Sequence, residues 1–231
     1  MILRMKTAKD LWIPYEWPDR RPLFLEKFFY LPGFYDQHES HGPVSWDDAR
    51  IFGNSQPVAI EYCSGNGQWI GEKARENPGM NWVAVEKCFE RARKIWLKLH
   101  REAIPNLFVV CGDANVFTQY YPPSESVAEI HVNFPDPWPK RRHAENRLVR
   151  LPFLQKALRI VVPGGKATFV TDDPVYASQM LQETFKDPNW RPLLESPYYS
   201  NDWSSYGSSF FADLWKEKGR QIYSMPFEKT R

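Results

Sequence analysis

The stretch Pro57-Val-Ala-Ile-Glu-Tyr-Cys-Ser-Gly-Asn-Gly67 joins a short apolar run to a glycine-rich turn. An apolar, partly β-branched run of this length that ends at a turn predicts a buried strand. The residues that follow, up to about residue 77, suit a helix. Gly65 and Gly67 permit a tight turn and let the backbone approach a ligand closely. A strand, a glycine turn and a helix in this order are typical of an α/β fold.

The same alternation continues along the chain. Further strands are predicted in four places, at residues 82–86, 107–111, 127–133 and 166–171. Helices are predicted after the second strand, up to about residue 102, and over about residues 146–160. Weaker strand candidates lie at residues 191–195 and 221–227. We therefore expect a Rossmann-like α/β fold, in which a mostly parallel, seven-stranded sheet carries helices on both faces.

Residues 1–50 are rich in Trp, Tyr, Phe and Pro and lack a clear period. Disordered segments are poor in aromatic residues, so we expect an N-terminal extension of loop and short helix that packs on the core. The main domain is expected to cover residues 51–231, which is within the size of a single domain.

The composition is ordinary, with 42% hydrophobic and 25% charged residues and a net charge of +2. One stretch of twenty residues is nevertheless strongly basic, and such a patch predicts a surface for phosphates. Its seven cations are Lys140, Arg141, Arg142, Arg147, Arg150, Lys156 and Arg159. The three cysteines and five histidines show no metal-ligand spacing, so no metal site is expected. The charged N-terminus and the lack of a long apolar run predict a cytoplasmic protein that does not enter a membrane.

A proline-rich segment, Asn133-Phe-Pro-Asp-Pro-Trp-Pro-Lys-Arg-Arg-His143, follows the strand at residues 127–133. Proline fixes its own φ and pushes the preceding residue into an extended conformation, so Asp136 is expected in a stiff loop. Trp138 lies beside this carboxylate, and potentially cationic side chains follow. The arrangement predicts a site for a base on an anionic polymer. The alternative is a proline-rich loop with a solvated charge cluster.

Ligands of doubly wound sheets bind beyond the carboxyl ends of the strands. Glu86, 19 residues after Gly67, fits the acid that binds a ribose diol. Glu61 would repel a pyrophosphate but would suit a cationic amino-acid cofactor, and Asp113 suits the exocyclic amine of adenine. Ile70 stands where the dinucleotide fingerprint has glycine or alanine. These residues favour S-adenosylmethionine over NAD, although Glu61 and Glu86 would also be explained as helix caps or as partners of lysines.

Taken in order, the motifs resemble the tRNA (guanine-N7-)-methyltransferase family of the bacterial single-chain type, over about residues 50–227. They are the Glu61 glycine turn, Glu86, Asp113-Ala114, the segment from Phe134 to His143, Arg147, Pro163-Gly-Gly165 and Thr171-Asp172. The resemblance implies a class I S-adenosylmethionine-dependent methyltransferase that methylates N7 of guanine 46 in the variable loop of tRNA. It also implies a monomer or homodimer that needs tRNA but no obligatory protein partner.

The resemblance assigns roles to individual side chains. Asp136 would be the catalytic or guanine-contacting acid. The residues expected at the cofactor are Glu61, Gly65, Glu86, Asp113, Ala114 and Asn133. Lys140, Asp172 and Ser209 are expected at the substrate, and Arg142, His143 and Arg147 at the RNA.

Three departures from the family pattern stand out. Cys63 occupies the first glycine position of the turn, the run from His143 to Arg147 carries fewer cations, and Ala212 replaces the glutamate of the C-terminal motif that begins at Ser209. Two other functions remain open at this point. One is methylation of another RNA site, and the other is RNA binding without catalysis, which a titration with S-adenosylmethionine would distinguish.

Overall fold

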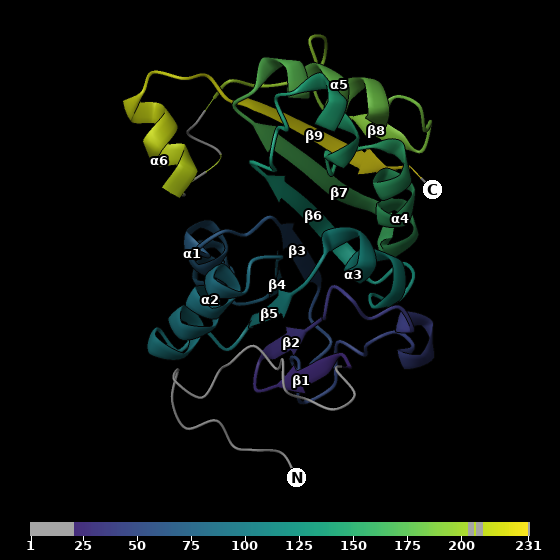
Figure 1. The fold of residues 1–231 in the computed structure, drawn as a ribbon, viewed down its shortest axis with the longest axis vertical. Helices are drawn as coiled ribbons and strands as arrows, with labels where there is room; N and C mark the ends of the chain where they lie inside the picture. Colours follow the sequence, from purple (N-terminus) through teal and green to yellow (C-terminus); the bar gives the residue numbers. More distant parts are fainter. Residues whose placement is uncertain (1–20, 203–205, 207–209, 231) are drawn as a thin grey trace.

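The computed structural model describes residues 21–202, 206 and 210–230, and in these residues nine strands form one sheet (Figure 1). The strands are β1 (Leu23–Leu25), β2 (Phe28–Tyr30), β3 (Val58–Tyr62), β4 (Asn81–Glu86), β5 (Leu107–Cys111), β6 (Val127–Asn133), β7 (Val161–Thr171), β8 (Trp190–Pro192) and β9 (Tyr223–Lys229). The order across the sheet is β1-β2-β5-β4-β3-β6-β7-β9-β8.

Helices cover both faces of this sheet. The described α-helices are α1 (Gln68–Glu76), α2 (Phe89–Arg101), α3 (Ala114–Tyr120), α4 (Leu151–Ile160), α5 (Pro174–Thr184) and α6 (Phe210–Glu217). Short 3-10 helices occur at His38–His41 and Arg141–Asn146. In Figure 1, α1 and α2 lie on one side of the sheet with α6, and α3, α4 and α5 lie on the other. No helix in the described part of the chain is long and apolar enough to span a membrane.

The central strands run parallel, as predicted. β3 pairs in parallel with β4 and with β6, β4 pairs with β5, and β6 pairs with β7. Only the C-terminal pairs β7–β9 and β8–β9 and the N-terminal hairpin β1–β2 are antiparallel among the described strands. The chain moves outward from β3 in both directions, so the boundary between β3 and β6 is the switch point at which ligands bind in such folds.

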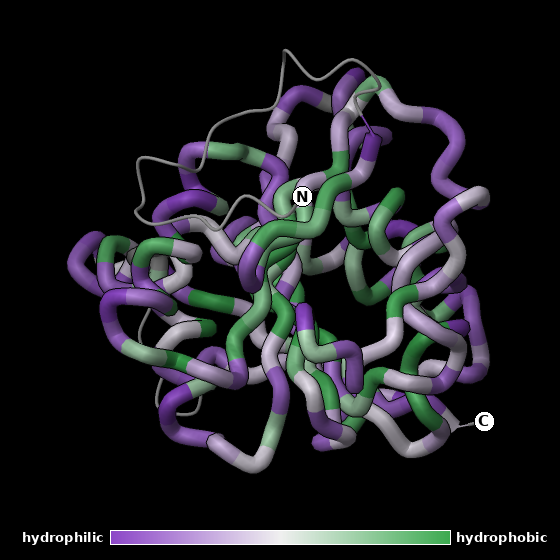
Figure 2. Tube along the Cα trace, turned by 90° about the horizontal axis from the view of Figure 1, so that it is seen from below, coloured by the Kyte–Doolittle hydropathy of each residue, from purple (hydrophilic) through white to green (hydrophobic). Residues whose placement is uncertain are grey.

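Continuous apolar sequences form the centre of the sheet. Every residue of β3, β4 and β5 is buried, which is typical of strands covered on both faces. Along β3 the side chains alternate, so that Ile60 packs with α3–α5 whereas Ala59 packs with α1 and α2. Figure 2 shows hydrophobic residues along the strands and hydrophilic residues around the outside.

The N-terminal segment contributes more regular structure than predicted. β1 and β2 form a hairpin, and β2 pairs in parallel with β5, with Phe28 and Phe29 almost fully buried. The sheet therefore has two more strands than the seven expected, and the expectation of loop and short helix was wrong at residues 23–30. A hydrogen bond attaches the hairpin to α2, because the Trp96 indole donates to the Glu26 carbonyl at 2.7 Å. The domain boundary at residue 50 stays a prediction.

One helix and one strand begin at residues other than those predicted. The helix expected from residue 146 begins at Leu151, because Pro152 belongs in a first helical turn. The strand expected from residue 166 begins at Val161, and its register against β6 shifts between Val127 and Glu129. Such an irregularity accommodates residues that a regular ladder excludes, including the proline at position 163.

Candidate active site

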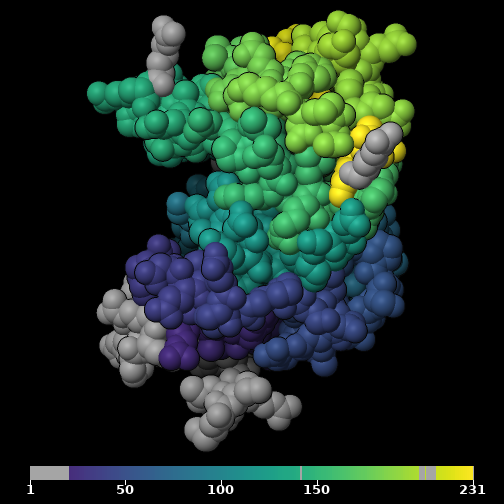
Figure 3. Space-filling view, turned by 90° about the vertical axis from the view of Figure 1, so that its right-hand side faces the viewer, coloured from purple at the N-terminus to yellow at the C-terminus, as the bar shows by residue number. Residues whose placement is uncertain are grey.

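A cavity of about 1110 Å³ lies at the carboxyl ends of the parallel strands. Its wall contains Glu86, the last residue of β4, and three acids that follow other strands, Asp113 after β5, Asp136 after β6 and Asp172 after β7. Figure 3 shows a notch in one side of the molecule, below the projecting chain around residues 140–150, and Trp138 and Asn146 line the cavity there. Its volume is at the upper end of the range for small-molecule sites, so a cofactor and a substrate base fit together.

The glycine turn between β3 and α1 lies beside this cavity, which Cys63 lines, and its Gly65 lines a smaller neighbouring cavity. Gly65 and Gly67 have φ values of 55° and 70°, and Gly67 caps α1. A Cβ on Gly67 would lie 2.7 Å from Ile95 Cγ1, so both the backbone and the space exclude a side chain. Cys63 also has a left-handed φ of 61°, which costs a residue with a side chain about 1–2 kcal/mol. The position at which the family has glycine thus retains a conformation that suits glycine.

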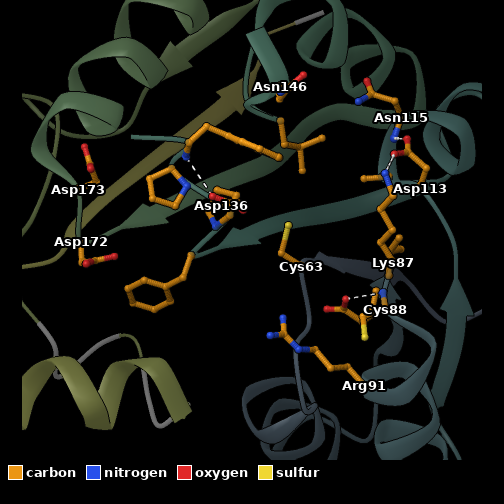
Figure 4. Close-up of a pocket in the computed structure, with 18 of the residues that line it drawn as sticks. Cys63, Lys87, Cys88, Arg91, Asp113, Asn115, Asp136, Asn146, Asp172 and Asp173 are labelled. Atoms are coloured by element: carbon orange, nitrogen blue, oxygen red, sulfur yellow. Dashed lines mark hydrogen bonds and ion pairs between the residues drawn. The ribbon is translucent and has the colours of Figure 1, made fainter. Parts of the chain in front are cut away.

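The Cys63 side chain points into the cavity between the two groups of labelled polar residues (Figure 4). Burial raises the pKa of this thiol, and the nearby carboxylates, first Glu86 and then Glu61, raise it further. The sulfur therefore stays protonated at neutral pH and does not act as a nucleophile.

Glu61 and Asn133 form a buried pair at the switch point. The Asn133 amide donates to Glu61 Oε1 at 2.8 Å. Their remaining oxygens, Glu61 Oε2 and Asn133 Oδ1, are buried and have no hydrogen-bond partner among the described residues. Both residues line a smaller cavity of about 70 Å³ beside the glycine turn. Burial raises the pKa of Glu61 to about 7, against the opposing effect of the Asn133 bond. Two orphaned acceptors at this point fit the ammonium group of an amino-acid cofactor.

Glu86, the last residue of β4, forms a hydrogen bond with the glycine turn. Its carboxylate accepts hydrogen bonds from the Gly65 amide at 2.9 Å and from the Cys88 amide at 2.8 Å. A carboxylate oxygen has more than one acceptor position, so these bonds leave capacity for the two hydroxyls of a ribose.

Asp113 is the N-cap of α3. Its Oδ1 accepts from the amides of Asn115 and Val116 at 2.9 and 3.3 Å, and its Oδ2 lies 3.2 Å from Lys87 Nζ. Asp113 thus has a capping role that the sequence suggested only for Glu61 and Glu86. It coexists with a place on the cavity wall, next to Ala114.

In Figure 4, Asp136 and Asp113 lie on opposite sides of Cys63. The Trp138 amide donates to Asp136 Oδ1 at 3.0 Å, and this bond fixes the carboxylate. Phe134 and Trp138 have left-handed φ values of 45° and 42°, so the loop is held in a conformation that non-glycine residues rarely adopt. The Trp138 ring stacks on His143 with 5.7 Å between ring centroids.

Asp172 lies on the same side of the cavity as Asp136. It forms an ion pair with Arg220 at 2.5 Å, and the Arg220 guanidinium lies 3.9 Å from the ring centroid of Trp215 on α6. Ser209, expected near this region, lies outside the described residues, whereas Ala212 is fully buried.

The predicted RNA-contacting residues separate into two groups. Lys140 and Arg142 are exposed at the 3-10 helix Arg141–Asn146, and Arg142 Nε donates to His143 Nε2 at 2.9 Å. Arg147 is only 8% exposed, and its Nε donates to the Pro137 carbonyl at 2.7 Å. The structure does not bring Arg147 to the same surface as Lys140 and Arg142.

Among the lining residues that were not predicted from the sequence are two pairs of large polar or aromatic side chains. Lys87 and Arg91 follow Glu86 at the end of β4, a position at which cavity residues were to be expected. Trp215 and Arg220 come from the C-terminal segment and belong to no motif that would have pointed to them. No group of three His, Cys, Asp or Glu residues within the described chain is arranged to hold a metal ion.

The sheet order, the glycine turn and the acids at successive strand ends define a class I S-adenosylmethionine-dependent methyltransferase. A solved structure of the 16S rRNA methyltransferase KamB shares this fold, with a TM-score of 0.59, 17% identity, and coverage of 82% of this chain and 95% of that one.

Sequence comparisons define the family more closely. The model of the family described as "Putative methyltransferase" matches residues 55–225. A protein of Chlamydia muridarum, named tRNA (guanine-N(7)-)-methyltransferase, is 42% identical over 96% of this chain and 97% of its own length. A protein of the same name from Geobacter metallireducens is 32% identical over 86% of this chain and 93% of its own. The chain belongs to the tRNA (guanine-N7-)-methyltransferase family, which confirms the resemblance noted from its motifs, and its cofactor is S-adenosylmethionine.

Proposed function

We propose that this protein transfers the methyl group of S-adenosylmethionine to N7 of guanine 46 in the variable loop of tRNA. The observation that carries the proposal is the fixed carboxylate of Asp136, which faces the cavity directly before an exposed basic segment at Lys140 and Arg142. The names of the relatives support tRNA as the substrate and guanine N7 as the acceptor. Position 46 rests on the resemblance of the motifs.

The residues that line the two cavities fit the cofactor. Glu61 Oε2 and Asn133 Oδ1 would accept the ammonium donors, and Glu86 would accept the ribose hydroxyls. Asp113 and Ala114 would line the adenine. Close approach of the cofactor to the backbone at Gly65 is possible because that position carries no Cβ. When bound, the cofactor supplies a methyl group on a sulfonium, which is a strong electrophile.

Guanine N7 has a free lone pair and carries no proton, so the transfer needs no general base. The N7–methyl bond forms as the sulfur–methyl bond breaks, and the electron pair of that bond stays on sulfur. The protein therefore acts by alignment and by electrostatics. The imidazole ring of the product is cationic, and Asp136 either stabilises this developing charge or holds the base by its Watson–Crick edge. Both roles require the carboxylate in its observed place.

The residues around the mouth of the cavity would bind the nucleotide and its flanks. Asp172, Lys140 and Ser209 are proposed to contact the guanosine, and Arg142 and His143 the RNA backbone. Because Asp172 is paired with Arg220, the arriving base must share or displace this ion pair. The Trp138–His143 stack offers an aromatic surface beside the base, and stacking on such a surface stabilises an extruded nucleotide.

We further propose that the enzyme acts on tRNA in the cytoplasm, as a monomer or homodimer, without an obligatory protein partner. The names of the relatives support tRNA as the partner.

Asp136→Asn tests the proposal because it keeps the size of the side chain and removes its charge. We expect methyl transfer to tRNA to fall by about a hundredfold or more, the effect of losing one well-placed electrostatic group. Affinity for S-adenosylmethionine, measured by calorimetry, should stay within about twofold, since Asp136 lies apart from the cofactor residues. Asp187→Asn, the same change at a position after α5, is the control. Near wild-type turnover in Asp136→Asn would contradict the proposed role.

A further inference from the structure

Arg147 is a buried cation beside the active-site loop. Its Nε donates to the Pro137 carbonyl at 2.7 Å, and its Nη1 donates to the Gln179 side chain on α5. The guanidinium also lies over the ring of Tyr176, 4.9 Å from the centroid, and Tyr176 is fully buried. Burying a guanidinium is favourable only when its donors are paired, and here two of its five donors are used, one on the loop and one on α5.

The Pro137 carbonyl and the Trp138 amide belong to one peptide unit. Its oxygen accepts from Arg147, and its N–H donates to Asp136 Oδ1 at 3.0 Å. A hydrogen bond from a charged donor to the oxygen of an amide polarises that amide and strengthens the bond that its N–H donates. One rigid peptide plane therefore connects the guanidinium of Arg147 to the carboxylate of Asp136.

The conformation of the Phe134–Trp138 loop requires stabilising contacts from outside the loop. Trp138 adopts a left-handed φ of 42°, and Phe134 one of 45°. Residues with side chains stay in such conformations only where surrounding contacts enforce them. Helix α5, which contacts Arg147 on the side away from the loop, is itself held in place. The Tyr176 hydroxyl accepts from the Val149 amide at 3.0 Å, and Asp173 caps the first turn of α5.

We infer that Arg147 is a positioning residue, which sets the place and orientation of the Asp136 carboxylate through the Pro137–Trp138 peptide. The inference rests on the proposed function, because it concerns the acid assigned to methyl transfer. It replaces the role in RNA contact expected from the sequence with a role inside the protein. Arg147 then governs the rate of the methyl transfer step and leaves tRNA affinity to Lys140 and Arg142.

Arg147→Lys tests this inference, because lysine keeps the charge but offers a single nitrogen in place of the separate Nε and Nη1 donors that reach Pro137 and Gln179. With cofactor and tRNA both saturating, we expect the single-turnover rate of methyl transfer to fall about tenfold to a hundredfold, as for a misplaced catalytic group. The dissociation constant for tRNA and its salt dependence should stay within about twofold of wild type. Arg191→Lys is the control, since Arg191 Nη2 donates to Glu228 Oε2 at 2.6 Å and lies outside the loop and the basic segment.

An unchanged rate at saturation, together with weaker tRNA binding and a flatter salt dependence, would overturn the inference and return Arg147 to the RNA surface. If Arg147→Lys does not fold, Gln179→Ala is the second test, because it removes the side chain on α5 to which Arg147 donates. We expect it to lower the single-turnover rate and to leave tRNA affinity unchanged. Any other result would overturn the inference.

Amide hydrogen exchange at Trp138 separates this inference from the proposed function. Loss of the Arg147 contact should speed exchange by about tenfold or more, whichever substrate the enzyme uses. A wild-type protein that methylates no tRNA would remove the proposed function, and the exchange result would still report on Arg147. Unchanged exchange at Trp138 in a folded variant would remove the positioning role alone.

Discussion

Glu61 is a buried acid that we propose to contact the ammonium group of the cofactor. One of its oxygens accepts from Asn133, and the other has no partner within the described chain. Burial raises the pKa of Glu61 from 4.5 to about 7. The protonated form is thus favoured in the folded, cofactor-free protein, so this group's contribution to stability is present below about pH 4.5 and is lost as the pH rises to about 7. A bound ammonium group reverses the balance, because it stabilises the ionised carboxylate.

The first prediction concerns the pH dependence of cofactor affinity. Below about pH 7, binding must first remove a proton from Glu61, so the dissociation constant for S-adenosylmethionine should rise by up to about tenfold per pH unit. Calorimetry between about pH 8 and pH 5.5 measures this slope. Glu61→Gln should bind more weakly and lose the slope. A wild-type affinity that does not change over this range would show that Glu61 does not contact the ammonium.

Gly67 is the subject of the second prediction. Gly67→Ala adds a Cβ at a φ of 70° and 2.7 Å from Ile95 Cγ1, and both effects oppose the turn. We expect the free energy of unfolding to fall by about 2–4 kcal/mol, from the strain and the overlap together. Gly79→Ala is the control, because a Cβ there meets nothing within 4 Å. Equal stabilities of the two variants in urea denaturation would contradict this account of the turn.

Single acids were the most predictable part of the site. Glu61, Glu86, Asp113 and Asp136 all lie at the cavities, because strand ends in a parallel sheet meet at one edge. Arg147 was placed on the RNA surface from its charge and its neighbours. A sequence does not show whether a guanidinium finds partners inside the protein, and here Pro137 and Gln179 supply them.

At the scale of elements, β3–β7 were predicted because each is an apolar run that is buried in the sheet. β1 and β2 have three residues each, which is too short for a period to be recognised. α3 and α5 were not predicted either. Asp113 and Asp173 cap them, but both acids stand in a row of strand-end residues that suggested ligand contacts instead.

The 3-10 helix Arg141–Asn146, with Lys140 before it, carries the third prediction. Lys140 and Arg142 are exposed beside the cavity, where phosphates of the variable loop would approach. Replacing both by alanine should weaken tRNA binding and lower its salt dependence by about two phosphate contacts, because each neutralised phosphate releases counterions. Filter binding over a series of salt concentrations measures the slope.

Cofactor affinity should be unchanged in this double variant. The control replaces Lys186 and Arg191 by alanine. Lys186 follows the C-terminal end of α5, and Arg191 belongs to β8. If both double variants keep the wild-type salt slope, the RNA surface lies elsewhere, for example along the exposed cations of α2.

At the scale of the whole molecule, the alternation of strands and helices was enough to predict a doubly wound sheet with a switch point. The order of the C-terminal strands was not predictable, since β9 inserts between β7 and β8 through contacts distant in sequence. The N-terminal hairpin extends the other edge beside β5. The result is a sheet whose strand ends bring Glu86 and Asp113, which we propose at the cofactor, and Asp136, which we propose at the base, to one cavity.

The central claim is methyl transfer to guanine N7 of tRNA, and mapping the methylated position tests it most directly. The purified protein is incubated with labelled S-adenosylmethionine and an unmodified tRNA, and the product is cleaved by chemistry specific for 7-methylguanosine. We predict a single labelled position, guanine 46, and no label in a matched tRNA that carries 7-deazaguanosine there, since that base keeps its pairing edge but lacks the N7 lone pair. Label at another position, or equal label in the 7-deaza tRNA, would contradict the account.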